Sequence, residues 1–316
     1  IFFFNPVRLA LMAVADADLI FAQTSVPFPS IALPSIPQVI LPQPALLLAG
    51  GFGGPLVVGG LTPLRNACTL AANDTASTAM QIMGRVFSSG ARSGWTGARS
   101  PAAASVIQFT MLGPGYHIYL GLLGNRKKAL VAVALTETLV MYGATTRNAQ
   151  LIHNQAAVGR DRVPVRSIMP VGPGFTAFLL RNCLAMAGIR VLSEPMARTL
   201  QWISGADASS KCSPGINMGG DFLASVLCGA LSMPFNQTFN FQVTNAACLA
   251  ATPAERFALA LRFLKTQYFM STASGSVRLR QTMLRDAMLR SSYIGCLFCC
   301  YSSLERLALH MSNQRE

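Results

Sequence analysis

The chain has 316 residues, of which 52% are hydrophobic and only 12% charged, and its mean hydropathy is +0.42. Soluble domains carry about 25% charged residues, so this composition excludes an ordinary soluble domain and favours a membrane protein. The net charge of +13 lies in connections between apolar stretches and not in a stripe with interleaved aromatic residues. That distribution argues against nucleic-acid binding and fits a protein oriented in a membrane.

Residues 1–44 form an apolar, proline-rich extension. The opening stretch from Ile1 to Ala22 predicts an amphipathic or interfacial helix, and the dense prolines that follow it predict extended chain. Two interpretations stay open: a tail that lies over the protein's own surface, or a segment that docks on a neighbouring subunit. Since the chain begins at Ile1, either an organellar presequence has been removed or the sequence is incomplete.

Beyond the extension, the sequence predicts six membrane-spanning helices. A span needs about 20 mainly apolar residues, because the hydrocarbon core of a bilayer is about 30 Å thick. Charges interrupt the fourth and sixth stretches, which are predicted from their equivalent places in the repeats described next. The six stretches are 45–71, 101–124, 129–151, 176–202, 219–245 and 287–309.

The apolar stretches repeat three times along the chain. In the odd-numbered stretches, a small-residue-rich segment runs into Pro63, Gly143 or Pro234, and a short polar tail follows each. Internal repetition is the strongest indication of architecture in a single sequence. We therefore predict an all-α membrane domain over 45–316, built from three two-helix repeats with pseudo-threefold symmetry. The repeats cover about 45–125, 126–205 and 206–310.

Several short motifs in this order resemble the mitochondrial carrier family. They are Gly90-x4-Trp95-Thr96-Gly97, the run from Phe178 to Asn182, and Met288-Leu289-Arg290. The resemblance covers about residues 45–310 and implies the carrier fold and the mitochondrial inner membrane. It also implies that Trp95 and Gly97 bind a phospholipid such as cardiolipin, while no other cofactor is expected.

The charged pairs that close the transport pathway in the family are missing from this chain. Family members carry acid–base pairs after the proline of each odd helix, and here those places hold neutral residues, except for Arg65 where an acid would stand. The outer ring is also incomplete. Its nearest counterparts are Glu194 with a displaced Arg198, a displaced Glu305, and Gly113 or His117 in place of an acid. The chain thus resembles a carrier that has lost its charge networks.

The resemblance also implies a remnant of a substrate site. The positions that match the family's cavity-facing residues hold Arg181 and Asn182 on the fourth helix, Arg290 on the sixth, and Arg99 as the nearest candidate on the second. Cations within a membrane are costly and usually face a water-filled cavity or an acid, so two of them suit an anionic, carboxylate-like solute. The alternative is that the arginines pair with acids or bind lipid phosphate.

The sequence carries no motif typical of an enzyme. The three histidines stand apart, and there is no nucleophile elbow or metal-binding HExxH pattern. The eight cysteines fall mostly in apolar stretches, where we interpret them as small buried residues and not as metal ligands. The glycines between Gly50 and Gly54 indicate close helix packing. We therefore predict neither catalysis nor a metal site.

Two functions follow from these observations. The first is an accessory subunit of a larger inner-membrane assembly, such as a respiratory complex or an ATP synthase, that has lost transport and is held by residues 1–44 and by membrane lipids. The second is a divergent transporter of a small anionic, carboxylate-like solute. Arg181, Asn182 and Arg290 favour the second function, while the lost charges favour the first.

Overall fold

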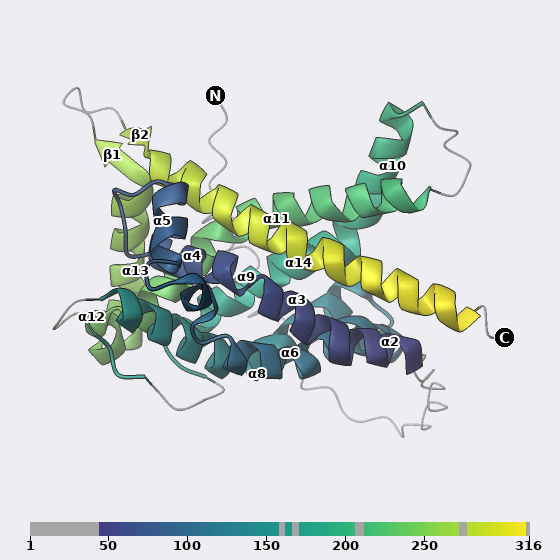
Figure 1. Ribbon diagram of the computed structural model, residues 1–316, viewed down its shortest axis with the longest axis horizontal. Helices are drawn as coiled ribbons and strands as arrows, with labels where there is room; N and C mark the ends of the chain where they lie inside the picture. The colour runs from purple at the N-terminus through teal and green to yellow at the C-terminus, as the bar shows by residue number, and fades with distance from the viewer. Residues whose placement is uncertain (1–43, 158–161, 166–170, 206–211, 272–276, 314–316) are drawn as a thin grey trace, which may run out of the picture. The chain divides into compact units, whose positions relative to one another are not determined.

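The computed structural model describes residues 44–157, 162–165, 171–205, 212–271 and 277–313. Apart from Pro44, the predicted N-terminal extension lies outside these described residues. Nearly all of the described chain is helical (Figure 1). The predicted helical architecture is confirmed at this level.

Six long helical segments account for most of the described residues. The first, second and fourth each consist of several helices in close succession. In chain order the segments are α2 (Pro44–Leu48), η1 (Ala49–Gly53), α3 (Gly54–Gly60) and α4 (Thr62–Ala71); α6 (Arg99–Thr110), η3 (Met111–Gly115) and α7 (Tyr116–Leu123); α8 (Arg126–Ala156); α9 (Phe175–Ala187), η5 (Gly188–Leu192) and α10 (Ser193–Ile203); α11 (Pro214–Thr244); and α14 (Gln281–Asn313).

Shorter elements follow the first and fifth segments. Two of them begin with capping boxes, Thr78 with Gln81 at α5 and Thr252 with Glu255 at α13, in which each side chain satisfies a free backbone amide of the first turn. A two-stranded antiparallel hairpin leads into α14. These shorter elements are α5 (Ala79–Val86), η2 (Ala91–Trp95), α12 (Ala246–Ala250), α13 (Pro253–Tyr268), β1 (Phe269–Ser271) and β2 (Val277–Leu279).

Among the described residues, three helices are long and apolar enough to cross a membrane: Arg126–Ala156, Phe175–Ile203 and Pro214–Thr244. The pair Leu46–Gly60 and Thr62–Ala71 qualifies when it is counted as one span bent by 53°. The segments α6–α7 and α14 do not meet the same test. The apolar helices indicate a membrane location, with three or four spans where six were predicted.

Of the three repeated positions Pro63, Gly143 and Pro234, only the first lies at a helix break. Leu61 separates α3 from α4, following Gly59 and Gly60, and Pro63 stands in the first turn of α4, where its missing amide does no harm. By contrast, α8 continues through Gly143 and α11 continues through Pro234. Glycine costs a helix interior only about 1 kcal/mol, and neighbouring helices re-satisfy the groups that an intramembrane proline frees.

The six segments pack in a closed ring. Each contacts the next along the chain, through α3 with α6, α6 with α8, α8 with α9, α9 with α11 and α11 with α14, and α14 returns to α4 and α2. Figure 1 shows α14 running alongside α11. Neighbours are antiparallel: Gly229 packs against Ser291, while Asp221, further back on α11, pairs with Arg306, further along α14. The carboxyl ends of the odd segments therefore gather on one side of the ring, where α4, α8 and α11 contact one another.

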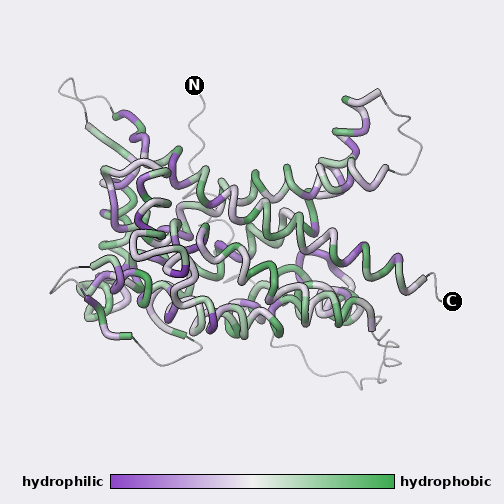
Figure 2. Tube along the Cα trace, in the orientation of Figure 1, coloured by the Kyte–Doolittle hydropathy of each residue, from purple (hydrophilic) through white to green (hydrophobic). Residues whose placement is uncertain are grey.

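The ring exposes apolar side chains and buries polar ones. On α8 the exposed stripe is Val131, Leu135 and Leu139, spaced by four residues so that they share one face. Leu223, Leu227 and Leu231 form the same stripe on α11. Figure 2 shows hydrophobic residues spread along these long helices. An exposed apolar surface of this kind fits contact with lipid.

Candidate functional site

Arg181, predicted to bind a substrate, lies on α9 and contacts α11. Its Nη1 donates a hydrogen bond to Oδ1 of Asn236 over 2.9 Å, and its guanidinium carbon lies 3.9 Å from the ring centroid of Phe178. Its Nε donates to Oδ1 of Asn182 over 3.2 Å. The partners are all neutral, and no described acid forms an ion pair with this arginine.

Asn182 lies beside Arg181, as predicted, and joins it to the third segment. Its Nδ2 donates to Oγ1 of Thr138 on α8 over 3.1 Å, and its side chain is almost completely buried. The amide thus uses its oxygen to hold the guanidinium of Arg181 and its nitrogen to contact α8. This geometry makes Asn182 a residue that positions Arg181.

Arg290, the other predicted cation, lies on α14 with only 3% of its surface exposed. Its Nε donates to Oγ of Ser232 on α11 over 3.3 Å, and its guanidinium carbon lies 5.7 Å from the ring centroid of Tyr293. Its partners are again neutral. Ser232 and Asn236, the partners of Arg290 and Arg181, lie one helical turn apart on α11, so the structure brings the two predicted cations into one charged cluster.

A third arginine joins this cluster. Arg65 on α4 is 9% exposed and repels both Arg181 and Arg290. The sequence analysis identified Arg65 as a cation at a position where the family has an acid. It did not predict Arg65 as part of the substrate site. The signal was present, because a charged residue inside an apolar stretch is expensive and usually functional.

One acid belongs to the same cluster. Glu137 on α8 is 6% exposed, accepts a hydrogen bond from Nε2 of Gln108 on α6, and interacts electrostatically with Arg181 and Arg290. It forms no ion pair with them. Sequence reasoning missed Glu137, although it is the one acid in the third apolar stretch. The cluster thus combines three arginines with one carboxylate, drawn from four different segments.

The structure does not bring Arg99 to the cluster. Arg99 is exposed and begins α6, nine residues before Gln108, which places it about 13 Å further along the helix axis. On α6 it is Gln108 that reaches the cluster, through its hydrogen bond to Glu137. An arginine at a helix start reaches water or lipid head groups more easily than the interior of the ring.

Trp95 and Gly97, predicted to bind lipid, both contact odd-numbered segments. The indole Nε1 of Trp95 donates to the carbonyl oxygen of Gly59 over 2.9 Å, close to the end of α3. Gly97 has a φ of +73°, and a Cβ there would lie 2.6 Å from Nδ2 of Asn148. These contacts give both residues a structural role, while the ring of Trp95 remains exposed at the surface.

Neutral amides join the three odd segments where their carboxyl ends meet. Nδ2 of Asn148 on α8 donates to Oδ1 of Asn66 on α4 over 3.3 Å. Nε2 of Gln150 on α8 donates to a backbone carbonyl oxygen of α11 over 3.1 Å, and Nδ2 of Asn240 on α11 donates to one of α4 over 3.4 Å. Within the described ranges no ion pair joins these helices. Neutral hydrogen bonds thus link each pair of these three helices near their carboxyl ends.

The even segments are joined by an ion pair that was not predicted. Nη2 of Arg190 in η5 lies 3.4 Å from Oε1 of Glu305 on α14, and donates to the carbonyl oxygen of Leu112 over 2.7 Å. The hydroxyl of Tyr301 donates to the same carboxylate over 2.8 Å. Gly113 leaves room for this arrangement, since a Cβ there would lie 2.5 Å from Oε1 of Glu305. Arg190 therefore connects three segments.

The predicted outer-ring residues Glu194 and Arg198 do not take part in this contact. They pair with each other within α10, over 2.5 Å, and both side chains are largely exposed. An exposed pair four residues apart in one helix stabilises that helix by only about 0.3–0.5 kcal/mol. Of the outer ring expected from the sequence, Glu305 alone joins two segments.

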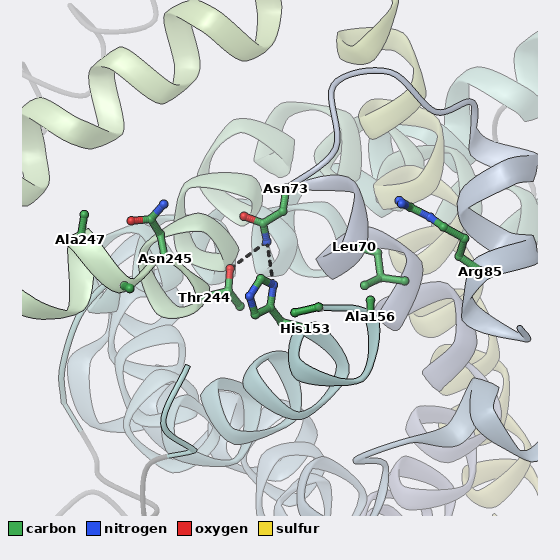
Figure 3. A pocket seen from close by; sticks show the side chains of 10 residues that line it. Leu70, Asn73, Arg85, His153, Ala156, Thr244, Asn245 and Ala247 are labelled. Carbon is green, nitrogen blue, oxygen red and sulfur yellow. Dashed lines mark hydrogen bonds between the residues drawn. The ribbon is translucent and has the colours of Figure 1, made fainter. Parts of the chain in front are cut away.

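A separate cavity of about 610 Å³ opens where α4, α8 and α11 end (Figure 3). Nδ2 of Asn73 donates to Oγ1 of Thr244 over 2.9 Å and lies 3.5 Å from Nδ1 of His153. None of the predicted site residues lines this cavity, so its volume says nothing about the arginine cluster. The lining residues are Leu70, Asn73, Arg85, His153, Ala156, Ala157, Thr244, Asn245, Ala246 and Ala247.

Asp74, beyond the end of α4, holds Arg85 at the rim of this cavity. Burial alone raises the pKa of Asp74, but hydrogen bonds from Ser77 and Ala76 and the charge of Arg85 outweigh that effect and lower the pKa to about 2. The ion pair with Arg85 completes this loop. Asp74 is thus ionised at neutral pH and fixes the connection between α4 and α5.

The cysteines differ in burial. Cys68, Cys228 and Cys248 are buried as predicted, whereas Cys300, which was predicted to be buried, is exposed. In the part of the chain that the structure describes, no three His, Cys, Asp or Glu side chains are grouped so that they could hold a metal ion.

Comparison with known proteins gives no match. No protein-family model matches the sequence, and a search of curated proteins finds no significant relative. Function must therefore be argued from the residues themselves.

Proposed function

We propose that this chain is a carrier-like protein with six membrane-crossing segments, located in the mitochondrial inner membrane. The closed antiparallel ring supports the fold, because a carrier is built from three helix pairs around a central axis. The contacts among α4, α8 and α11 on one side of the ring support the pseudo-threefold arrangement. The location follows from the resemblance of the motifs to the carrier family.

We further propose that the protein binds a small, carboxylate-like anion within the ring, as a transporter does. One observation carries this proposal: Arg65, Arg181 and Arg290 are buried together, and none forms an ion pair with a described acid. Buried cations that repel one another are unfavourable until an anion neutralises them. An anionic solute would supply that charge, with Asn182 and Asn236 holding Arg181 in place.

Binding and uptake by the reconstituted full-length protein test this function. The probes are butyrate, glutarate and propane-1,2,3-tricarboxylate, which carry one, two and three carboxylates on chains of similar length. We expect Arg181→Ala and Arg290→Ala each to abolish uptake and to remove the thermal stabilisation by these anions. Arg262→Ala is the matched control, because Arg262 is an exposed arginine outside the cluster. Failure of the unmodified protein to bind any of the three anions contradicts the proposal.

A second candidate function is that of an accessory subunit of a larger inner-membrane complex. The neutral amide contacts between the odd segments favour it, because alternating access needs two states that a substrate can switch, and the charged pairs of the family are absent. The proposed attachment through residues 1–44 lies outside the described residues. Blue-native electrophoresis of gently solubilised membranes tests this function: co-migration with a large complex supports it, and migration as a free monomer contradicts it.

A further inference from the structure

The cavity at the ends of α4, α8 and α11 is a second candidate binding site, separate from the arginine cluster. Its volume of about 610 Å³ lies within the range of about 300–1,000 Å³ that is usual for small organic ligands. Its lining comes from every repeat: Asn73 and Arg85 from the first, His153 from the second, and Thr244 and Asn245 from the third. A ligand in this cavity would therefore contact all three repeats at once.

The hydrogen bonds of Thr244 fix the orientation of the Asn73 amide. The hydroxyl of Thr244 has a single proton and donates it to the carbonyl oxygen of Asn240 over 2.7 Å. It therefore accepts from Asn73, whose Nδ2 lies 2.9 Å away and is also 3.5 Å from Nδ1 of His153. The oxygen of the Asn73 amide points away from these two contacts, as Figure 3 shows, and is left as an acceptor in the cavity.

Asn245 presents the opposite group to the cavity. Its Oδ1 accepts from the backbone amide of Cys248 over 3.2 Å and so caps α12, which leaves its Nδ2 as a donor. Figure 3 shows Asn245 on one side of Asn73 and Arg85 on the other. An acceptor on Asn73 and a donor on Asn245 match the N–H and the carbonyl of an amide group in a ligand.

Arg85 supplies the positive charge of the cavity. Its Nη2 donates to Asp74, and its other guanidinium nitrogens keep their donors for a ligand. None of the described lining residues is an acid. Because Asp74 already offsets part of the charge of Arg85, a group with one negative charge suits this site better than a group with two. Small side chains on α8 and α12 leave room beside these polar groups: Ala156, Ala157, Ala246 and Ala247.

We propose that this cavity binds a small organic anion with one carboxylate and a neighbouring amide group. The carboxylate pairs with Arg85, the amide N–H donates to Oδ1 of Asn73, and the amide carbonyl accepts from Nδ2 of Asn245. The bound ligand stabilises the contact among α4, α8 and α11, because its partners come together only in this arrangement. The inference does not depend on the anion site within the ring, since the arginine cluster contributes none of the described lining residues.

Calorimetric titration of the purified full-length protein with hippurate, in mild detergent, tests the inference. Hippurate carries one carboxylate, one amide and a flat ring. Of its two matched analogues, 4-phenylbutanoate has the same length without the amide, and hippuramide has no charge. We expect hippurate to bind at least about tenfold more tightly than either analogue, because each analogue leaves polar groups of the cavity without a partner. Hydrogen exchange at the carboxyl ends of α4, α8 and α11 should slow when hippurate binds.

Asn245→Asp is the most informative variant, because it keeps the oxygen that caps α12 and replaces the Nδ2 donor by a negative charge. It should weaken hippurate binding by at least about tenfold, and Arg85→Gln should do the same. Arg92→Gln is the matched control, since Arg92 is an exposed arginine outside the cavity, and it should leave the affinity unchanged. Arg181→Ala should also leave it unchanged.

The outcomes separate this cavity from the site within the ring. Hippurate binding that is lost in Asn245→Asp and kept in Arg181→Ala supports the inference, whatever the result for anion uptake. The opposite pattern places the ligand in the ring and overturns the inference, as does equal affinity for the three compounds or no binding of hippurate. If thermal unfolding shows that Asn245→Asp does not fold, Ala247→Phe decides, because it fills the cavity from an exposed position: lost binding supports the inference, and retained binding overturns it.

Discussion

Asn148 and Asn66 meet side chain to side chain, with Nδ2 of the first 3.3 Å from Oδ1 of the second, and this contact joins α8 to α4. Asn148 also donates to the carbonyl oxygen of Thr96, in the connection that precedes α6. One buried amide thus links the second repeat to two parts of the first. Because the contact involves no formal charge, added salt cannot screen it as it would screen an exposed ion pair.

The first prediction concerns this contact. Asn148→Ala removes the donor to Oδ1 of Asn66 and leaves that oxygen buried, so we expect the free energy of unfolding to fall by about 1–3 kcal/mol. The loss should be the same at low and high salt. Thermal unfolding of the purified protein in mild detergent measures it, and Gln281→Ala, a truncation at an exposed amide, is the control. A loss that shrinks as salt is added would show that charge is involved.

The second prediction concerns Gly113. A methyl group there would lie 2.5 Å from Oε1 of Glu305 and 2.7 Å from the hydroxyl of Tyr301, so Gly113→Ala should displace the Arg190 ion pair. We expect a destabilisation of about 1–3 kcal/mol, as for other overpacked sites. Gly121→Ala is the matched control on the same segment, since a Cβ there meets nothing within 4 Å. Equal melting temperatures for the two variants would contradict the close packing at Gly113.

The third prediction concerns the coupling between Arg190 and Glu305. Both side chains are mostly buried, so removing one charge leaves the other without its partner in a poorly solvated place. We expect Arg190→Met and Glu305→Gln each to destabilise the protein more than half as much as the double variant does. A double-mutant cycle on unfolding free energies measures the coupling, which should be on the order of 1 kcal/mol. Additive effects would mean that the two residues do not stabilise each other.

The fourth prediction concerns pH and Asp74. Its pKa is about 2 in the folded protein against 3.8 as a model group, so folding favours the ionised carboxylate. The stabilisation is therefore fully present above about pH 4 and is lost as the pH falls toward 2. Asp74→Asn should be less stable than the unmodified protein at neutral pH, and the difference should vanish at the acid end. Unfolding measured across this range checks it, and a difference that grows as the pH falls would contradict the assignment.

The sequence was sufficient to predict the positions of the long helices, because apolar length and internal repetition are local properties. The predicted stretch 176–202, for example, corresponds to the helical run from Phe175 to Ile203. The predicted stretches 129–151 and 219–245 run through Gly143 and Pro234, as α8 and α11 do. The sequence did not reveal that the first predicted stretch, 45–71, is broken at Leu61. Whether a proline interrupts a buried helix depends on neighbours that no local pattern records.

The sequence predicted only part of the candidate site, because contacts between distant segments are not recorded in any local pattern. Arg181 and Arg290 could be matched to the places of a known motif, and the structure brings them into one cluster. Glu137 and Arg65 belong to other segments, and only the folded ring brings them together. Arg190 was missed because its partner Glu305 is 115 residues away along the chain. Arg99 was predicted from alignment alone and lies at the exposed start of its helix.

The bend at Leu61 gives the first repeat a mechanical property that the other two lack. A straight rod passes a rotation applied at one end to the other end, and α8 and α11 are each unbroken over 31 residues. The first odd segment turns by 53° between its two parts, and a Cβ on Gly59 or Gly60 would meet nothing within 4 Å. Arg65 therefore lies on a short helix whose axis differs from that of the preceding part of its segment. A rotation of that preceding part about its own axis would not pass straight to Arg65, as it would along α8 or α11.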